Sequence, residues 1–304
     1  MKYAIETRGL SKSYGRVRAV ESVDLHVGQG EIYGFLGLNG AGKTTTIRAL
    51  LGMIRPTSGS VRVLGHAVGP NGNGPWQRVG HLVEEPAAYP ELTVRENLEI
   101  ARRLQGISDK SATSRAIERL SLASYADRKA GVLSAGNFLR LGLARAFLHE
   151  PELLILDEPA NGLDPAGIIE IRALLRRLAD QKGVTIFMSS HHLDEVEHLA
   201  DRVGIVHAGS LVEEVDYGEL REHGRFAIEI EVDDVARAER ILRDELGFVG
   251  LSRSGEASLR ITDRTAKPAP IARALIGAGI ALERLVPMEE DLERHFMRLT
   301  GGES

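Results

Sequence analysis

Apolar positions along the chain alternate between short runs of strand length and longer stretches with helical periodicity. Apolar runs cover residues 31–36, 153–156 and 184–188, and such runs are typical of central strands that are covered on both faces of a sheet. Helical patterns cover 44–53 and 166–181. Strands that alternate with helices in this way predict an α/β fold with a parallel sheet.

A polar helical segment interrupts this alternation. It covers about 94–130, with breaks near 106–109 and 122–126. Thr93 and Glu96 have the spacing of a capping box, which predicts a helix start at this point. A further helix is expected over 138–149, with Ser134 in its N-cap region. We therefore expect a helical subdomain over about 86–150.

The pattern changes near residue 220, where the first domain should close. Gly224 marks the boundary, so we expect one domain over 1–222 and an accessory domain over 225–304. Alternating apolar residues predict a strand from Phe226 to Val232, and the following order of elements is βαββαβ, which indicates a ferredoxin-like α+β unit. A last amphipathic helix should place Leu292, Phe296 and Leu299 on one face.

Composition narrows the class of protein. The chain has 304 residues, a formal net charge of −5 and no cysteine, which is ordinary for a globular protein and excludes thiolate chemistry and disulfides. No apolar run approaches the ~20 residues of a membrane span, and no signal peptide follows Met1, so we expect a cytosolic chain. The mild acidity gives no support for nucleic acid as a partner.

The segment Gly37–Thr45 fits the phosphate-binding loop pattern G-x-x-x-x-G-K-[ST], between an expected strand and an expected helix. Its three glycines, Gly37, Gly40 and Gly42, allow a sharp turn whose N–H groups approach phosphate oxygens, and we include Asn39 and Thr45 of this loop in the nucleotide site. A glycine-rich turn that binds nothing is the alternative.

The two residues after the last glycine, Lys43 and Thr44, provide a positive charge and a hydroxyl group that can bind a metal. Lys43 should contact the β- and γ-phosphates, and the Thr44 hydroxyl is placed to bind the Mg²⁺ that accompanies ATP. The positive end of the following helix faces the same phosphates. This stretch predicts a site for Mg-ATP.

Acidic residues and a histidine follow the other two apolar runs. Asp157 and Glu158 end the run at 153–156, where open α/β sheets bind ligands. Asp157 can hold Mg²⁺, and Glu158 can polarise a water for attack on the γ-phosphate. His191, after the run at 184–188, can contact that phosphate. The alternatives are a solvated acidic turn and a structural histidine.

Four further residues are candidates on less specific patterns. Tyr14 could stack on an adenine ring, although an ordinary turn tyrosine is the simpler interpretation. Ser134 and Gly136 open a helix and offer a second phosphate site, although a plain helix cap would have the same sequence. Asp164 lies in the turn at 161–165.

Taken in order, these motifs resemble the ATP-binding subunit of ABC transporters, in particular the drug, bacitracin and lantibiotic exporter group. The resemblance covers about residues 3–220 and identifies the Walker A, signature and Walker B motifs at 37–45, 133–137 and 153–158. It also implies a D-loop that contains Asp164, a switch histidine at His191 and an adenine-stacking role for Tyr14.

The family resemblance further implies an assembly. Two cassettes pair head to tail in this family, so that Ser134 and Gly136 would contact ATP bound to the other chain of a homodimer. ATP binding closes the dimer, hydrolysis opens it, and the motion drives a separately encoded membrane permease. The chain would then be peripheral on the inner face of the cell membrane.

Two motifs depart from the family pattern. Glu84 stands where a glutamine usually faces the metal, and a carboxylate can bind Mg²⁺ but cannot donate as an amide does. The signature has Ala135 and Asn137 where glycine and glutamine are usual. Two other functions stay open. One is a soluble ABC-type ATPase acting on ribosomes or nucleic acid, although the sequence shows no second cassette, long coiled coil or basic patch. The other is a nucleotide-sensing regulator with little turnover, which the altered signature and Glu84 support.

Overall fold

The computed structural model describes residues 3–69, 74–84, 86–216, 227–255, 257–263 and 266–288, together with 296 and 299. The chain divides into two compact units, 1–218 and 219–304, and each is described by itself. The expected boundary at 222–225 lies outside the described residues. Among the helices that are described, none is long and apolar enough to cross a bilayer.

A six-stranded sheet forms the centre of the first unit, in the order β11-β10-β4-β9-β8-β7. The strands are β4 (Ile32–Leu36), β7 (Val79–Leu82), β8 (Leu153–Asp157), β9 (Thr185–Ser190), β10 (Arg202–His207) and β11 (Ser210–Asp216). The pairings between β10, β4, β9, β8 and β7 are parallel, and β11 is antiparallel to β10. The carboxyl ends of the parallel strands therefore meet at one edge.

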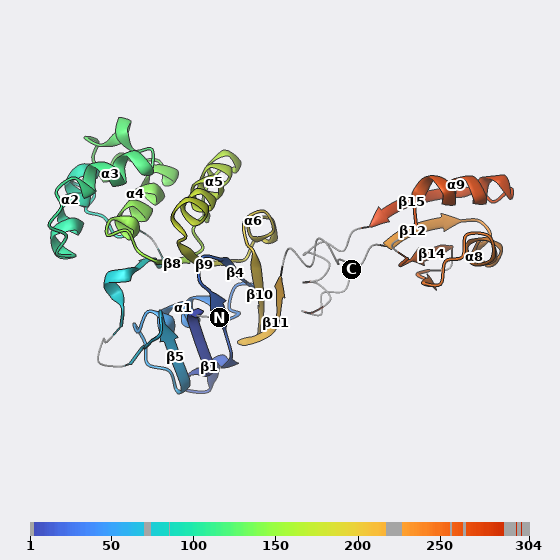
Figure 1. The fold of residues 1–304 in the computed structure, drawn as a ribbon, viewed down its shortest axis with the longest axis horizontal. Coiled ribbons are helices and arrows are strands. Elements are labelled where there is room, and N and C mark those ends of the chain that lie inside the picture. Colours follow the sequence, from blue (N-terminus) through green and yellow to red (C-terminus); the bar gives the residue numbers. More distant parts are fainter. Residues whose placement is uncertain are drawn as a thin grey trace. The chain divides into compact units, whose positions relative to one another are not determined.

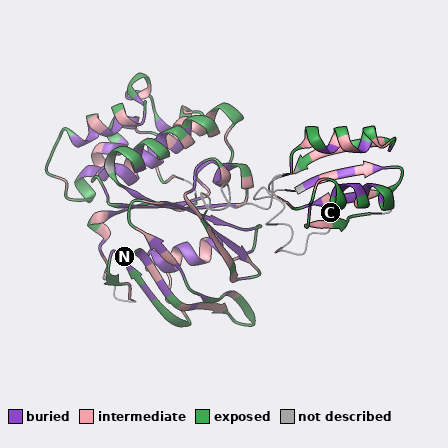
Figure 2. Ribbon diagram, turned by 45° about the vertical axis from the view of Figure 1, so that its right-hand side comes forward, coloured by how far each residue is buried: buried purple, intermediate pink, exposed green. Residues whose placement is uncertain are grey.

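Both faces of this sheet are covered, as the continuous apolar runs require. Leu154 and Leu156 of β8 belong to one core cluster and Leu153 and Ile155 to the other, because successive side chains point to opposite faces. Figure 1 shows α2 to α5 on one side of the sheet and α1 on the other. The strands between them are almost entirely buried (Figure 2).

The helices of this unit are α1 (Lys43–Leu50), α2 (Val94–Leu104), α3 (Ala112–Arg119), α4 (Ala135–Phe147), α5 (Pro165–Lys182) and α6 (Leu193–Glu197). Short 3₁₀ turns, η1 (Trp76–Arg78), η2 (Ala123–Tyr125) and η3 (Ala130–Val132), lie between them. The capping box of Thr93 and Glu96 is present at the start of α2. Helix α4 starts at Ala135 and not at 138, because the Ser134 side chain caps it by accepting from Asn137 N.

A second sheet packs on the other side of α1. Its strands are β1 (Tyr3–Tyr14), β2 (Val17–Val23), β3 (His26–Gly28), β5 (Ser58–Val63) and β6 (His66–Ala67). Strand β1 continues to Tyr14, so this residue ends a strand and is not the turn tyrosine that the sequence suggested as the simpler interpretation. Tyr14 pairs with Val17, and the tight turn between them is possible because Gly15 takes a positive φ of 60°.

The second unit is an antiparallel sheet with two helices, and it confirms the expected α+β fold. Its elements are β12 (Ala227–Val232), α8 (Val235–Asp244), β13 (Leu251–Arg253), β14 (Ser258–Ile261), α9 (Pro268–Gly277) and β15 (Leu282–Met288), and the sheet order is β13-β14-β12-β15. Ile228, Ile230 and Val232 enter its core. Phe296 is buried, whereas Leu292 of the expected last helix lies outside the described residues.

Candidate nucleotide-binding site

The loop between β4 and α1 has two positions, Gly37 and Gly42, where only glycine fits. Gly37 leaves β4 so close to the neighbouring strand that a Cβ atom would lie 2.5 Å from the carbonyl oxygen of Val206. Gly42 has a φ of +100°, and a Cβ there would lie 2.4 Å from the carbonyl oxygen of Ala19. The sequence pattern of the loop is therefore a steric requirement of this turn.

The start of α1 is open to an anion. Gly42 is the N-cap of α1 and supplies no side-chain hydrogen bond to the helix. The first N–H groups of a helix have no partner within the helix, and they carry its positive partial charge. The N–H groups of Lys43, Thr44 and Thr45 thus begin a helix whose first turn is suited to phosphate.

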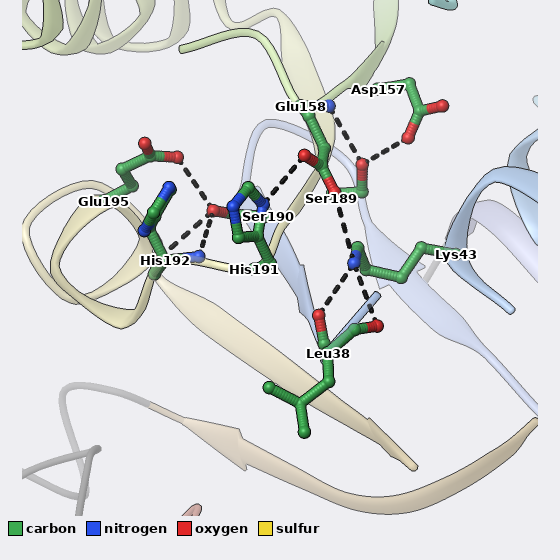
Figure 3. Close-up of polar contacts among 10 residues, drawn as sticks. Leu38, Lys43, Asp157, Glu158, Ser189, Ser190, His191, His192 and Glu195 are labelled. Atoms are coloured by element: carbon green, nitrogen blue, oxygen red, sulfur yellow. Dashed lines mark hydrogen bonds and ion pairs between the residues drawn. The ribbon is translucent and has the colours of Figure 1, made fainter. Parts of the chain in front are cut away.

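Lys43 is folded into this loop, and its side chain is only 5% exposed. Its Nζ donates to the carbonyl oxygen of Gly37 at 2.7 Å and to that of Leu38 at 3.3 Å (Figure 3). It also lies 3.2 Å from Glu158 Oε1. A buried ammonium group held beside a phosphate loop supplies full positive charge where an anion would bind.

Glu158 lies between two basic groups from different elements. It directly follows β8, and its Oε2 is 2.8 Å from Nδ1 of His191, which directly follows β9 (Figure 3). Its other oxygen faces Lys43. The structure thus brings together the three side chains expected from the sequence, at the carboxyl edge of the parallel sheet.

The preceding acid, Asp157, is buried at the end of β8. Its Oδ1 accepts a hydrogen bond of 2.6 Å from Ser189 Oγ. The same Oγ accepts from the backbone N–H of Glu158 at 3.0 Å. Ser189 was not a candidate from the sequence, and the signal that could have found it is a polar pair, Ser189-Ser190, at the end of an apolar strand.

A second serine holds the turn that carries His191. Ser190 Oγ donates to Glu195 Oε2 at 2.7 Å and accepts from the N–H of His192 at 2.9 Å (Figure 3). The Glu195 carboxylate is buried, with only 4% of the residue exposed. These contacts of Ser190 and Glu195 could not be predicted from the sequence, because a glutamate in the first turn of a helix is usually exposed and nothing in the sequence shows that Glu195 is buried.

The oxygen donors fit a small hard cation that also binds phosphate. The Thr44 hydroxyl and the Asp157 carboxylate supply one neutral and one charged oxygen, and Mg²⁺ is usually bound by one or two protein ligands with phosphates and waters. No group of three or more histidine, aspartate or glutamate side chains suited to a metal occurs in the described part of the chain.

Glu84 takes another partner. It has a positive φ of 61°, and its carboxylate forms an ion pair with Arg48 of α1. The structure records no contact between Glu84 and either Thr44 or Asp157, all of which are described. The ion pair between Glu84 and Arg48 therefore joins the loop after β7 to helix α1.

Three of the expected nucleotide contacts, Tyr14, Asn39 and Gly40, are exposed. Tyr14 is 48% exposed, and Lys12 Nζ is 5.0 Å from the centre of its ring. Asn39 and Gly40 are exposed at the tip of the loop. These positions are open to solvent, as contacts to a nucleotide require.

The three remaining candidates lie at the starts of two other helices, which Ser134 and Asp164 cap. Ser134 Oγ accepts from Asn137 Nδ2 at 3.1 Å as well as from its N–H, and Gly136 follows in the first turn of α4. Asp164 caps α5 by accepting from Gly167 N at 2.9 Å. Within one chain these residues serve as caps, and the described contacts do not join them to Lys43, Glu158 and His191.

A phosphate loop between a parallel strand and a helix, with a lysine, a glutamate and a histidine at the same sheet edge, defines a P-loop nucleoside triphosphatase. A family model described as "ABC transporter" matches residues 20–161. Together with relatives that are 36% and 40% identical over nearly the whole chain, this match shows that the chain belongs to the family of ABC transporter ATP-binding proteins, and it is an ABC-type ATPase.

Relatives of this family match almost the whole chain. The bacitracin transport ATP-binding protein BcrA of Bacillus licheniformis is 40% identical over 99% of this chain and 99% of its own length. The daunorubicin/doxorubicin resistance ATP-binding protein DrrA of Streptomyces peucetius is 36% identical over 98% of this chain and 92% of its own length. The similarity therefore includes the C-terminal unit.

Solved structures agree with the fold of the first unit. An ATP-binding subunit of an ABC transporter covers 72% of this chain and 92% of its own, with 30% identity and a TM-score of 0.63. A dimeric ATP-binding cassette bound to ADP and Pi covers 70% of this chain and 98% of its own, with 22% identity and a TM-score of 0.64. The second likeness concerns the fold alone.

Proposed function

We propose that this protein is the ATP-hydrolysing subunit of a membrane exporter for a drug, antibiotic or peptide. The observation that carries the proposal is the placement of Glu158 between Lys43 and His191 beside the phosphate loop. The relatives that match nearly the whole chain are named for bacitracin transport and drug resistance, which favours export over a soluble ATPase or a regulatory nucleotide sensor.

Each of the three side chains has a distinct task in this proposal. Glu158 polarises the attacking water, because a carboxylate at the end of β8 can accept its proton. Lys43 neutralises charge on the β- and γ-phosphates. His191 holds Glu158 on one side and contacts the γ-phosphate on the other, so it can respond when that phosphate leaves.

A magnesium ion belongs to the proposed site. Thr44 and Asp157 would hold it together with phosphate oxygens, and Glu84 would join them if it leaves Arg48. The ion supplies charge neutralisation for the phosphates. The backbone N–H groups of Asn39, Gly40, Gly42 and Thr45 would cradle the phosphates.

The working assembly is proposed to be a homodimer with ATP between the chains. Tyr14 would stack on the adenine of ATP bound to its own chain. Ser134, Gly136 and Asp164 would act on ATP bound to the partner, which agrees with their separation from Lys43 and Glu158 within one chain. An exposed helix start capped by Ser134 offers the N–H groups for that contact.

The permease would be a separately encoded protein, and it would hold this chain at the inner face of the membrane. A groove of about 760 Å³ between the loop after β7 and α4 is suited to a permease helix. Its lining combines apolar residues such as Trp76, Met53 and Pro86 with Arg145, His81 and His149, and no carboxylate is among the lining residues that the structure describes. Burial lowers the pKa of Arg145, and an acidic residue on the permease helix would offset that cost.

Residues 1–222 are proposed as the ATP-binding domain, with a helical subdomain over about 86–150, and residues 225–304 as an accessory domain. The division of the chain into two compact units supports this boundary to within a few residues. Helices α2, α3 and α4 share one apolar core within the expected subdomain. Their motion relative to the phosphate loop would reach the permease through the groove.

The proposal is tested by Glu158→Gln. The variant keeps the shape of the side chain and loses its ability to take a proton, so we expect turnover with Mg-ATP to fall by about 10³-fold while ATP affinity stays within a few-fold. Turnover by the purified protein and ATP-dependent dimerisation by light scattering are the measurements, and the variant should accumulate as an ATP-bound dimer.

Glu152→Gln is a matched control, because Glu152 is a partly exposed acid that pairs with Arg78. It should leave turnover unchanged. Equal turnover by wild type and Glu158→Gln would remove Glu158 from its role. If a neighbouring gene encodes a membrane protein, co-purification of the wild type with that protein tests the membrane assignment.

A further inference from the structure

Ser189 connects the two acids of the site through one hydroxyl group. The residue is completely buried, and it lies directly opposite Asp157 in the parallel pairing of β8 with β9. Its Oγ is 2.6 Å from Asp157 Oδ1 and 3.0 Å from the backbone N of Glu158 (Figure 3). Both distances are within the normal range of hydrogen bonds.

The directions of these two bonds follow from chemistry. A serine hydroxyl has one proton to donate and lone pairs to accept. The ionised Asp157 carboxylate can only accept, and the Glu158 N–H can only donate, so Ser189 donates to the first and accepts from the second. One side chain thereby satisfies a buried carboxylate oxygen and a backbone N–H at adjacent positions.

The backbone that Ser189 holds is unusual. Glu158 has a φ of +46°, which non-glycine residues rarely adopt. Such a conformation persists when surrounding contacts fix it. The bond from Glu158 N–H to Ser189 Oγ is one of these contacts, and it acts on the backbone immediately before the side chain that lies between Lys43 and His191.

We propose that Ser189 is a positioning residue of the ATPase site, which orients the Asp157 carboxylate for a metal ion and the Glu158 backbone for its side chain's contact with water. This inference rests on the proposed function. Asp157 Oδ1 is held by Ser189, which leaves Oδ2 as the oxygen without that bond. Without the hydroxyl, the Asp157 carboxylate can rotate and the Glu158 N–H loses its acceptor.

The test is Ser189→Ala in the full chain. We expect kcat to fall about 10- to 100-fold, the range for losing a hydrogen bond to a charged group, with the KM for ATP changed less than about threefold. We also expect the affinity for Mn²⁺ in the presence of a non-hydrolysable ATP analogue, measured by electron paramagnetic resonance, to fall about tenfold. Unchanged kcat and unchanged Mn²⁺ affinity would overturn the inference.

Thr185→Val is the matched control. Thr185 is a buried residue at the opposite end of the same strand, and its Oγ1 accepts from Gly30 N at 2.9 Å. The variant should lower thermal stability and leave kcat and Mn²⁺ affinity unchanged. If it lowers both as much as Ser189→Ala does, the effect is a general loss of strand stability and the inference is wrong.

Two further measurements keep the outcomes separate. Ser189→Cys keeps a similar volume, but its thiol is only a weak hydrogen-bond donor. If the alanine variant does not fold, the positioning role predicts that the cysteine variant lowers both kcat and Mn²⁺ affinity, and unchanged values of both would overturn the inference. Mn²⁺ binding does not require turnover. A wild type without turnover whose Mn²⁺ affinity still depends on Ser189 would count against the proposed function and in favour of the positioning role.

Discussion

Clusters of charged and polar side chains lie at both the carboxyl and the amino ends of the central parallel strands. The two clusters differ in whether unpaired backbone N–H groups accompany them. At the carboxyl edge, Glu158 contacts both Lys43 and His191 beside a helix that no side chain caps. At the amino edge, Tyr33 of β4 and Arg202 of β10 are neighbours across the strands. Charge and burial alone would not tell these clusters apart.

At the amino edge, the polar side chains contact one another. The buried Tyr33 hydroxyl donates to Glu214 Oε1 at 2.6 Å, and the Arg202 guanidinium lies 5.9 Å from the centre of the Tyr33 ring. Gly204 leaves room for the hydroxyl, since a Cβ there would lie 2.3 Å from it. Burial, followed by the charge of Glu214, raises the pKa of Tyr33 well above its ordinary value.

The difference lies in the backbone. At the amino edge the strands begin with their N–H groups paired, as when Ile32 N donates to Asp201 Oδ2 at 2.8 Å. At the carboxyl edge, helix α1 starts after Gly42, which makes no side-chain cap, and the first N–H groups of a helix have no partner within the helix. A cluster of charges marks a binding site when unpaired backbone donors accompany it.

The largest expected effect that separates the edges comes from Lys43→Ala. Loss of the buried ammonium group should weaken ATP binding by about 100-fold, because its charge-assisted contact to phosphate disappears. Isothermal titration of ATP into wild type and variant measures the change. Lys129→Ala, which removes an exposed lysine, should leave the affinity unchanged. Equal ATP affinity in Lys43→Ala and wild type would count against the phosphate-loop assignment.

A smaller effect of the opposite kind is expected from Tyr33→Phe. Loss of the bond to Glu214 should lower the free energy of unfolding by about 1–2 kcal/mol, with ATP turnover within twofold of wild type. Urea denaturation and turnover measure the two quantities. Tyr3→Phe, at a residue that is 37% exposed, should change stability by less than about 0.5 kcal/mol. A large loss of turnover with unchanged stability would show that the amino edge is part of the active site.

The smallest expected effect concerns pH. Burial raises the pKa of Glu31 above its ordinary value of 4.5, although a hydrogen bond from Gly28 N acts against this. The protonated form is therefore favoured by folding, and this stabilisation is complete below pH 4.5 and is lost as pH rises through the folded-state pKa. Glu31→Gln mimics the protonated form, so it should be more stable than wild type at pH 7, by less than about 1 kcal/mol.

Urea denaturation at several pH values tests this prediction, because the difference between Glu31→Gln and wild type should vanish toward pH 4.5. A variant that is less stable than wild type at pH 7 would show that attraction between Glu31 and Arg202, 3.9 Å apart, outweighs the cost of burial.

The phosphate loop, the central strands and the α+β order of the C-terminal unit could be predicted from the sequence, because each depends on local spacing. The glycine pattern specifies a turn, an apolar run specifies a strand with two covered faces, and alternation specifies a half-buried strand. Predictions failed at element ends: β1 continues to Tyr14 and α4 starts at Ala135, because a hairpin turn and a cap set those ends.

The sequence by itself determined that Lys43, Asp157, Glu158 and His191 follow strands or a loop of one α/β sheet. Only the tertiary structure decided which groups meet them: Ser189 beneath the two acids, Arg48 on Glu84, and Glu195 behind the turn of His191. The physical reason is that strand order and register bring together residues far apart in the chain, as the pairing of β8 with β9 does for Asp157 and Ser189.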